Sequence, residues 1–596
     1  MRLITTLATC GIAAAVALGG SASAQTVCTP DITDATPLGP VAGCDRIWGD
    51  EPDEAFIVLD SIVFVIETEL TILPGTIVRG QPRNTAFMPG TPLAGAPGTL
   101  VVPRGSFLNA RGTAGAPIVF TTAAVDNDND GIPDDVSAAG GQVPGDGNPD
   151  DWTPGDLFLD DTPLANPLAP LFPNGEQAYG LHGGIVLMGF APTNLDASAT
   201  GNIGEGLCEG LPVPGVLPGG SDYGGGEPHD SSGHLEYVSV RHAGDEIDDA
   251  NELNGITLCG VGDGTIMRNI EGYANDDDGI EMFGGTVNFE NVVIAYVGDD
   301  SIDVDQGYTG VIQDALTLHI FFDENDGDEI GTGGSGGSAG EFDGEDCPAC
   351  FPGPAPFVVP QPNMVITNWT SMGNVEGGLN GGITNPAVDA NTDNQGLDAD
   401  SSWCGVVANS LFIGYEGGAE PALEGSPHGV ANGRPCSYLV ASSGDGILAE
   451  DWPAAAARGD LQAEGPGSGG DPQGEEEFIH GDPDGTTCPA GSACNRFPVA
   501  GYQFLVNENH YFRPTGVLAG GRAKLLGSKT DDAGVIGGAP FDPRPATPGD
   551  PEVSGGVEPQ WPGTDRSETY KGAFPDSADE LWLEPWSVLA IGGLID

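Results

Sequence analysis

The fold is decided by three stretches of one pattern: Leu235–His242 (LEYVSVRH), Ile266–Tyr273 (IMRNIEGY) and Phe289–Tyr296 (FENVVIAY). In each stretch apolar residues alternate with others up to a final aromatic ring or imidazole. An acidic turn and another short strand follow the second and the third stretch. Asp278 and Asp300, which hold the same place in the two turns, lie 22 residues apart, about one coil of a β-helix. Because one coil cannot bury its inner face alone, this repeat predicts stacked coils with a common core.

Short strands recur on both sides of this centre, with Gly, Pro or Asp at the breaks. They run from Phe56 to Thr121 before it and over 364–371, 406–413 and 438–448 after it. A sandwich or a propeller also has many short strands, but parallel strands with Val, Ile and Leu facing inward favour a solenoid. Helical periodicity is nearly absent. We therefore predict an all-β chain folded as a right-handed parallel β-helix.

Four Gly/Pro/Asp-rich insertions interrupt the coils, at 126–178, 196–232, 323–362 and 455–500. We interpret them as loops at coil corners, where solenoids commonly form their binding sites. The predicted β-helix, with an N-terminal cap and these insertions, spans 25–511. Terminal repeats of a solenoid need caps, so 512–596 is predicted to be a C-terminal cap, with a separate docking segment as the alternative.

The N-terminus is typical of a secretory leader. Arg2 precedes a small, apolar run, and Ala22-Ser23-Ala24 fits a cleavage site that leaves Gln25 first. A lipoprotein would use Cys10, but most of the apolar run follows that residue. We therefore expect a signal peptide over 1–24 and export from a Gram-negative bacterium to the periplasm, outer surface or medium. No later segment is long and apolar enough to predict a transmembrane span.

The charge of the chain excludes two classes of partner. With 18 Lys+Arg against 88 Asp+Glu, the net charge is −70. Such a chain repels nucleic acid and anionic membranes and suits surroundings rich in divalent cations. Acidic chains are often disordered, but 39% hydrophobic residues in strand-like runs argue against disorder here.

Cysteines predict a disulfide framework. The chain has 11, and without Cys10 an even number remains in an exported protein. A redox role for the C-x-x-C at 347–350 is the alternative to a loop clip, although no thioredoxin-like pattern surrounds it. Pairing of sequence neighbours gives Cys28–Cys44, Cys208–Cys259, Cys347–Cys350, Cys404–Cys436 and Cys488–Cys494.

Several blocks of the chain resemble exported bacterial β-helix repeat proteins. They are FIVLDSIVFVIETELTILPGTIVRG and LVVPRGSFLNARGTAGAPIVFTT between Phe56 and Thr122, GHLEYVSVRHAGDEI, NDDDGIEMFGGTVNFENVVIAYVGDDSIDVDQGY, and YKGAF followed by Trp582 and Trp586. The resemblance spans most of the chain in blocks separated by the insertions. It implies a pectin-lyase-like β-helix fold and export. The family has no settled activity, so the resemblance implies little about chemistry.

The best candidate for calcium is the acidic loop DNDNDGIPDD at 126–135. Calcium takes six to eight hard oxygen ligands, and D-x-D-x-D-G brings three carboxylates to one tight turn. It is similar to the acidic calcium repeats of thrombospondin-type modules; an EF-hand would need Glu where Ser137 stands. The alternative is a solvated acidic loop, and 323–328 is a weaker second candidate. The predicted structural Ca²⁺ ligands are Asp126, Asp128, Asp130, Asp134 and Asp135.

The candidate catalytic residues are Asp278, Asp299 and Asp300. Stacked coils place them side by side on one exposed strip, where crowded carboxylates serve as general acid and base. Asp278-Gly279-Ile280 followed by Asp299-Asp300 resembles polygalacturonase-type β-helix glycosidases. Two further motifs of that family, G-H-G and R-I-K, are missing, which puts substrate clamping in doubt.

A polysaccharide lyase would instead need a basic residue beside the acidic strip. Arg241, His242 and Arg268 are the candidates for that role and for substrate binding. A plainer interpretation is that the arginines pair with surplus carboxylates and the histidine is simply hydrogen-bonded.

The sequence thus favours a secreted or cell-surface binding or structural protein, stabilised by disulfides and calcium, that engages polysaccharide on its acidic strip. A carbohydrate-active enzyme, hydrolase or lyase, is the alternative, and calcium-dependent assembly into a surface layer is a third. No complete catalytic set identifies an enzyme.

Overall fold

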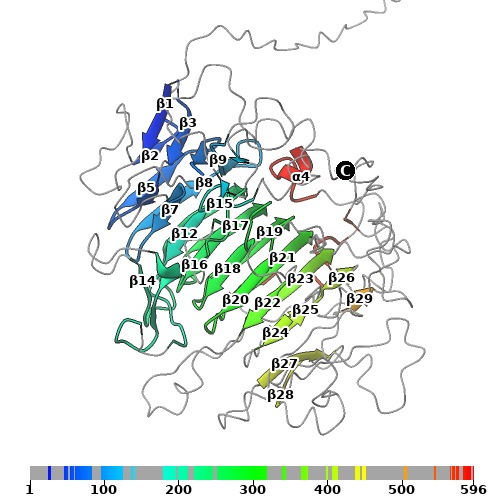
Figure 1. Ribbon diagram of the computed structural model, residues 1–596. Coiled ribbons are helices and arrows are strands. Elements are labelled where there is room, and N and C mark those ends of the chain that lie inside the picture. Colours follow the sequence, from blue (N-terminus) through cyan, green and yellow to red (C-terminus); the bar gives the residue numbers. More distant parts are fainter. Residues whose placement is uncertain are drawn as a thin grey trace, which may run out of the picture.

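The computed structural model is an all-β solenoid built from two stacks of parallel strands (Figure 1). The described residues are 46–50, 54–59, 61–82, 96–124, 179–195, 199–211, 221–245, 252–318, 339–343, 364–372, 406–413, 564–565, 567–570, 572–575, 581–591 and 595, with short pieces at 24–28, 136–137, 141–142, 398–400, 437–442, 446–451, 503–505 and 543–544. None of the helices in this part of the chain has the length and apolar character that crossing a bilayer requires.

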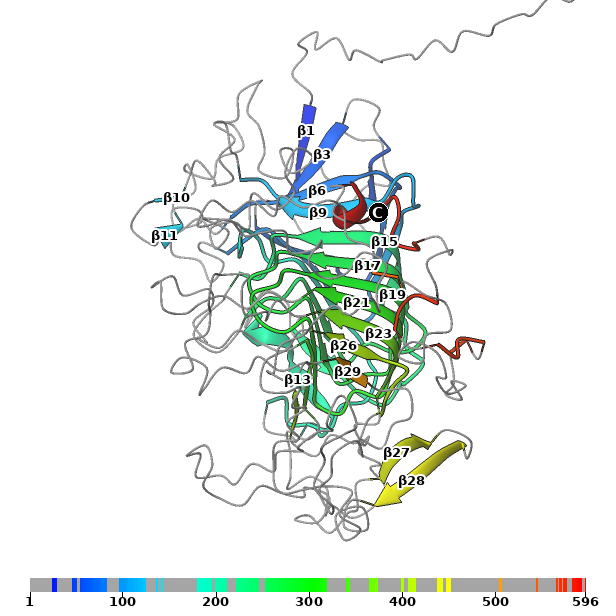
Figure 2. The same ribbon diagram turned by 90° about the vertical axis from the view of Figure 1, so that its right-hand side faces the viewer.

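The larger stack, which we call the long sheet, has 15 strands. Its members lie side by side along the solenoid (Figure 2). They are β1 (Ala24–Cys28), β2 (Ile47–Trp48), β3 (Glu54–Leu59), β5 (Glu69–Ile72), β6 (Ile77–Gly80), β8 (Phe107–Arg111), β9 (Ile118–Thr122), β15 (Gly233–Arg241), β17 (Ile266–Tyr273), β19 (Asn288–Ala295), β21 (Val311–Leu318), β23 (Val365–Met372), β25 (Val406–Ala408), β26 (Leu411–Ile413) and β29 (Gln503–Leu505).

The smaller stack, the short sheet, has eight strands and alternates with the long sheet along the chain. It comprises β4 (Ile62–Phe64), β7 (Thr99–Val102), β12 (Ile185–Met188), β16 (Ile256–Cys259), β18 (Ile280–Phe283), β20 (Ile302–Asp305), β22 (Glu341–Asp343) and β24 (Asp398–Asp400). Three antiparallel pairs lie outside both sheets: β10 (Val136–Ser137) with β11 (Gly141–Gln142), β13 (Glu205–Leu207) with β14 (Asp222–Gly224), and β27 (Ser437–Ser442) with β28 (Gly446–Asp451).

The three stretches that predicted the fold are β15, β17 and β19, paired in parallel and in register. Leu235 lies opposite Met267, and Met267 opposite Phe289. These side chains face the interior and belong to one continuous core that runs from Trp48 to Val407. This parallel, in-register pairing around a common core confirms the prediction of a parallel β-helix. Each coil leaves an apolar face that the next coil covers.

A column of left-handed residues bends every long-sheet strand from β15 to β23. We call it the corner column: Tyr237, Asn269, Asn291, Asp314 and Asn368, continued by Asn409 beyond β25. Asparagine tolerates positive φ because its short amide bonds to nearby groups. Within the column, Asn291 Nδ2 donates to Asn269 Oδ1 at 3.2 Å. The column therefore turns the chain at the same place in each coil.

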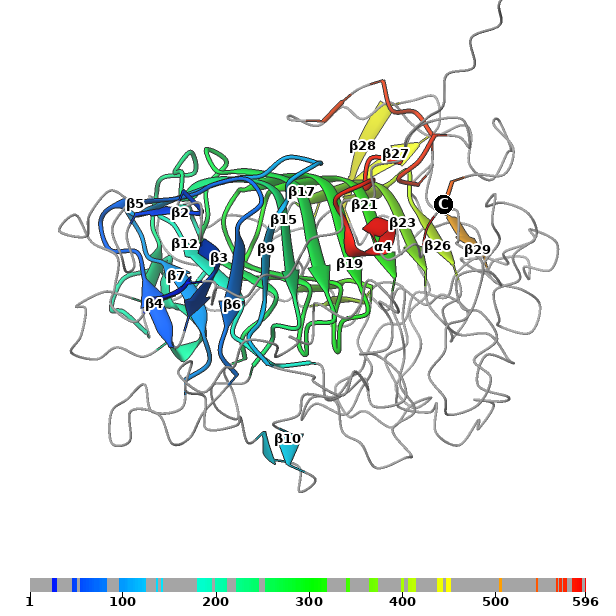
Figure 3. The ribbon, with the colours of Figure 1, turned by 90° about the horizontal axis from the view of Figure 1, so that it is seen from above.

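The described part of the C-terminal segment lies along the outer face of the long sheet (Figures 2 and 3). Its helix α4 (Val588–Ile591) and the buried Trp586 pack in one cluster with Tyr273, Tyr296 and Leu316. A solenoid with apolar residues pointing outward needs such a cover, because exposed apolar area is unfavourable. These residues cover the side of the long sheet.

Candidate functional site

Acidic side chains form a column on the outer face of the short sheet. Strand residues alternate between core and surface, and Glu281, Asp303 and Glu341 hold the same outward position on β18, β20 and β22. We call these three the acidic column; Asp398 of β24 continues the register. Neighbouring strands are about 4.8 Å apart, so like charges here repel. Such a row is unfavourable unless protons or cations neutralise it.

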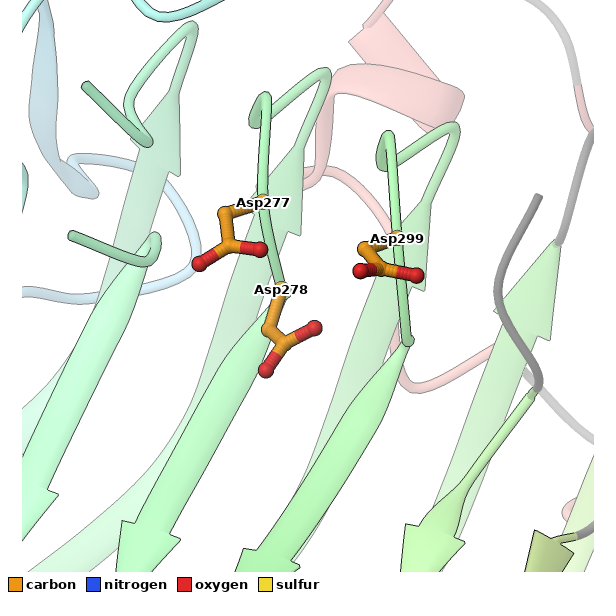
Figure 4. Close-up of side chains that lie close together, drawn as sticks. All are labelled: Asp277, Asp278 and Asp299. Atoms are coloured by element: carbon orange, nitrogen blue, oxygen red, sulfur yellow. The ribbon is translucent and has the colours of Figure 1, made fainter. Parts of the chain in front are cut away.

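The turns that lead into β18 and β20 add further carboxylates. Figure 4 shows Asp277 and Asp278 on one turn and Asp299 on the next coil, with the three side chains close together. One ligand oxygen of each of these three lies within 4.8 Å of the other two. A second group with the same closeness joins Asp278 to Glu281 and Asp303. Asp278 belongs to both groups and links the turns to the acidic column.

Asn254 positions the carboxylates from the preceding coil. Its Oδ1 accepts the backbone N–H of Asp278 at 3.1 Å, and its Nδ2 donates to Thr257 Oγ1 at 3.2 Å and to Glu281 Oε2. One coil later, the N–H of Asp300 donates to Asp278 Oδ1 at 2.9 Å. Apart from the bond to Thr257, these bonds run between coils, so stacking itself sets the geometry of the cluster.

Burial raises the pKa of five carboxyls in this region well above their usual range: Asp277, Asp278, Glu281, Asp300 and Asp303. Burial is the largest cause. The next is the negative charge of neighbouring carboxylates: Asp299 raises the pKa of Asp277, and Glu341 raises the pKa of Asp300. A hydrogen bond with Glu281 opposes the rise in the pKa of Asp303. The cluster therefore holds protons more tightly than free carboxyls do, or takes up cations in their place.

The structure brings the predicted residues Asp278, Asp299 and Asp300 onto adjacent turns, as their spacing indicated. The strip is less exposed than expected, because Asp278 and Asp300 are only 6% and 3% exposed while Asp299 is half-buried. Each turn is so short that its backbone stacks directly on the next, as in the bond from Gly279 N–H to the Asp300 carbonyl. The accessible part of the cluster lies at Asp277 and Asp299.

Arg241 and His242 lie at the end of β15. Arg241 is buried on the long sheet, where its Nε donates to Ser239 Oγ at 2.8 Å. His242 is fully buried and its ring meets Tyr273 edge-on. Both residues therefore lie on the long sheet and not beside the acidic turns, and their role in substrate binding stays a prediction.

Arg268 is also on the long sheet, near the start of β17. Its Nε lies 3.0 Å from Glu290 Oε2 in an ion pair, and both side chains are more than half exposed. This contact is the surface ion pair that the plainer interpretation expected, and such pairs contribute little to stability.

One predicted disulfide is confirmed. Cys208 and Cys259 are bonded, which fastens the β13–β14 hairpin beside the outer face of β16. Cys44, Cys347, Cys350, Cys404, Cys436, Cys488 and Cys494 lie outside the described residues, as do the side chain of Cys28 and the calcium loop with Asp126, Asp128, Asp130, Asp134 and Asp135. Those pairings and that loop stay predictions.

The sequence interpretation missed the acidic column and Asn254. A signal for the column was present, because β20 (IDVD) and β22 (EFD) place acidic residues at alternate positions and β18 (IEMF) has one between apolar residues. Alternation on a half-buried strand puts those residues on the outer face. Asn254 carried no comparable signal, since its role depends on contacts between coils.

Comparison with known proteins gives one match. Residues 171–342 match a family described as a pectate-lyase like beta helix domain. The matched stretch contains the acidic turns and the acidic column. No curated protein and no solved structure is similar enough to count as a match. Together with the two stacks of parallel strands, this match shows that the chain is a parallel β-helix protein that is similar, over 171–342, to a pectate-lyase-like domain.

Proposed function

We propose that this protein binds Ca²⁺ on the outer face of the short sheet and uses the bound cations to hold an anionic polysaccharide. The observation that carries the proposal is the convergence of Asp277, Asp278 and Asp299 within 4.8 Å, beside the second group at Glu281 and Asp303. Calcium takes carboxylate oxygens in flexible geometries, and two groups that share Asp278 suit it better than the strict octahedron of Mg²⁺.

Electrostatics supports a cation on this face. The charges that act most strongly on Asp277 are Asp299, Glu252, Asp276 and Glu209, all carboxylates. A divalent cation offsets this negative field, and its remaining coordination positions can take the carboxylate oxygens of an anionic ligand. A uronate polymer carries such charge at regular intervals, whereas a neutral polymer gains nothing from the metal.

The family match supports the ligand class. Its description refers to pectate lyases, and this chain matches it over the coils that hold the acidic residues. The predicted signal peptide supports a role outside the cytoplasm, where both calcium and such polymers are found. Binding, without cleavage, is the function we propose, because Arg241 and Arg268 have structural or surface contacts on the other sheet.

The test is calorimetric titration of the purified chain over 25–596 with CaCl₂, followed by retention on immobilised polygalacturonate with and without chelator. We expect calcium binding, and retention that chelator abolishes. Immobilised dextran, a neutral polymer, is the control and should retain nothing. Retention that is equal on both polymers, or unaffected by chelator, would contradict the proposal.

Hydrolysis is a second candidate, which one observation favours. Asp300 is buried and hydrogen-bonded to Glu341, and both burial and the charge of Glu341 raise the pKa of Asp300. A carboxyl whose pKa is raised beside other carboxylates is what a general acid requires. Release of oligosaccharides that Asp299→Asn abolishes, in a variant that still folds, would establish this function in place of binding alone.

A further inference from the structure

The described part of the C-terminal segment is fastened to the corner column by polar contacts. Gln313, next to Asp314, accepts the N–H of Asp565 at 2.8 Å and donates to Glu568. Asn368 Nδ2 donates to the carbonyl of Tyr570 at 3.0 Å. The corner column and the adjacent Gln313 thus both turn the coils and bind Asp565, Glu568 and Tyr570.

Asp314 is the acidic member of this column. Its neighbours in the next coils on either side, Asn291 and Asn368, carry amides, which can donate and accept at once. An aspartate has the same shape but donates only when it is protonated. At this place the column therefore carries a group that can donate only while it keeps a proton.

Glu568 of the C-terminal segment meets Asp314 at the seam. Tyr570 Oη donates to Asp314 Oδ1 at 3.5 Å, and Gln313, the residue before Asp314, donates to Glu568, so the two carboxyls face each other. Two facing carboxyls repel each other when both are ionised and can share a hydrogen bond when one of them keeps its proton. Asp314 is only 7% exposed, so water cannot take the place of that proton.

The other charged groups around this pair do not replace the proton. Glu290 on β19 adds negative charge, and its own partner is Arg268, at 3.0 Å near the surface. Asp565 is fully exposed, and hydrogen bonds from Ser567 hold its pKa below the usual value. Facing Asp314 are therefore Glu568, Glu290 and the Tyr570 hydroxyl.

We propose that Asp314 and Glu568 share one proton and form a pH-sensitive latch that holds the C-terminal segment against the long sheet. When the proton leaves to solvent, two facing carboxylates remain and residues 564–575 loosen. The latch uses neither the acidic turns nor the acidic column, so it goes beyond the proposed function.

The direction of the effect follows from the shift of each group. Burial, the charge of Glu568 and the bond to Glu568 raise the pKa of Asp314 well above its usual range, and burial raises the pKa of Glu568. A raised carboxyl pKa means that the docked state binds the proton more tightly than the undocked state. Docking is therefore fully stabilised below about pH 4 and weakens as pH rises through the pKa of the docked pair.

The test is hydrogen exchange of the full chain over 25–596, at about pH 5.5 and about pH 8.5, with rates expressed relative to the unfolded chain. We expect protection in peptides covering 564–575 to fall at least about tenfold at the higher pH, the effect of one pKa unit. Peptides from β17 serve as the internal reference for the stability of the whole solenoid and should lose less protection than peptides covering 564–575.

Variants separate the latch from general loosening. Asp314→Asn supplies an amide that donates at any pH, so its protection should be equal at both values. If Asp314→Asn fails to fold, Glu568→Gln supplies the amide from the C-terminal segment without changing the solenoid, and its protection should also be equal at both pH values. Asp565→Asn removes an exposed charge three residues from Glu568 and should keep the full pH effect. Equal protection at both pH values in the unsubstituted chain, or an undiminished pH effect in Glu568→Gln, would overturn the latch.

Discussion

The backbone N–H of Asp300 donates to Oδ1 of Asp278 at 2.9 Å, across one coil of the solenoid. This bond stabilises the ionised form of Asp278 and so opposes the effects of burial and of neighbouring charges, which raise its pKa. Asp278 also belongs to both groups of convergent carboxylates. It is therefore the residue whose charge matters most to a bound cation.

Replacing Asp278 should weaken calcium binding more than replacing any exposed carboxylate. Asp278→Asn keeps the shape and can still accept the Asp300 N–H, but it removes one charged ligand from both groups. We expect the affinity for Ca²⁺ to fall at least about tenfold in calorimetric titration, about 1.4 kcal/mol. Asp263→Asn, which changes a loop carboxylate paired with His229, is the matched control and should bind normally. Unchanged affinity in Asp278→Asn would place the metal elsewhere.

Stability without calcium should fall as pH rises. Burial raises the pKa of Glu281 and of Asp303, so the folded chain keeps protons that the unfolded chain has lost above about pH 4. Where the folded state binds more protons, the free energy of unfolding decreases with pH. In chelator, urea midpoints should therefore decrease between about pH 5 and about pH 8.

Two comparisons test this pH dependence. Calcium should reduce the decrease, because the cation replaces the protons that the acidic column loses. Asp303→Asn should also reduce it, by removing one of the carboxyls that must ionise. Urea midpoints that rise with pH in chelator would contradict the prediction, because ionisation of the acidic column would then not destabilise the folded chain.

The disulfide should stabilise the chain even though it lies outside the core of the coils. Cys208 and Cys259 are 51 residues apart in sequence and both are buried. Closing a loop of that length is worth about 4 kcal/mol through the entropy of the unfolded chain. Cys208→Ser should lower the free energy of unfolding by roughly 2 to 4 kcal/mol in urea titration. If reductant changes the Cys208→Ser variant as much as the unsubstituted chain, another disulfide accounts for the effect.

The period of the chain made the acidic turns predictable. Asp278 and Asp300 hold the same place in consecutive coils, and no insertion separates them. Glu341 lies within the stretch 323–362 that we interpreted as a loop insertion, so its alignment in the acidic column could not be read from spacing. The alternation of acidic and apolar residues does indicate that Glu341 faces outward, but this alternation is a local property of each strand.

Contacts between distant segments could not be predicted in the same way. The C-terminal segment was expected to be a cap or a docking segment, and its described part lies beside β15 to β23, with Val588 N–H bonded to Glu271 of β17. No repeat relates residues 564–595 to the sheet they cover. The outward Tyr273 and Tyr296 were a signal in retrospect, since a solvated face does not need them.

The last prediction concerns backbone conformation at the corner column. Glycine should be the more stable replacement for Asn291, in the column, and alanine the more stable replacement for Asn109, in a strand. Asn291 has φ +62° and donates to Asn269, so either substitution loses that bond, about 1 kcal/mol. Alanine is also strained at positive φ, and Asn291→Ala should be less stable than Asn291→Gly by about 1 kcal/mol.

Asn109 in β8 has an extended backbone and donates to Glu69 at 3.2 Å. Within a strand glycine is the poorer residue, so Asn109→Gly should be less stable than Asn109→Ala by roughly 0.5 to 1 kcal/mol. Urea titration of the four variants measures both differences, and the same order at both positions would mean that the left-handed corner does not determine residue choice in the column.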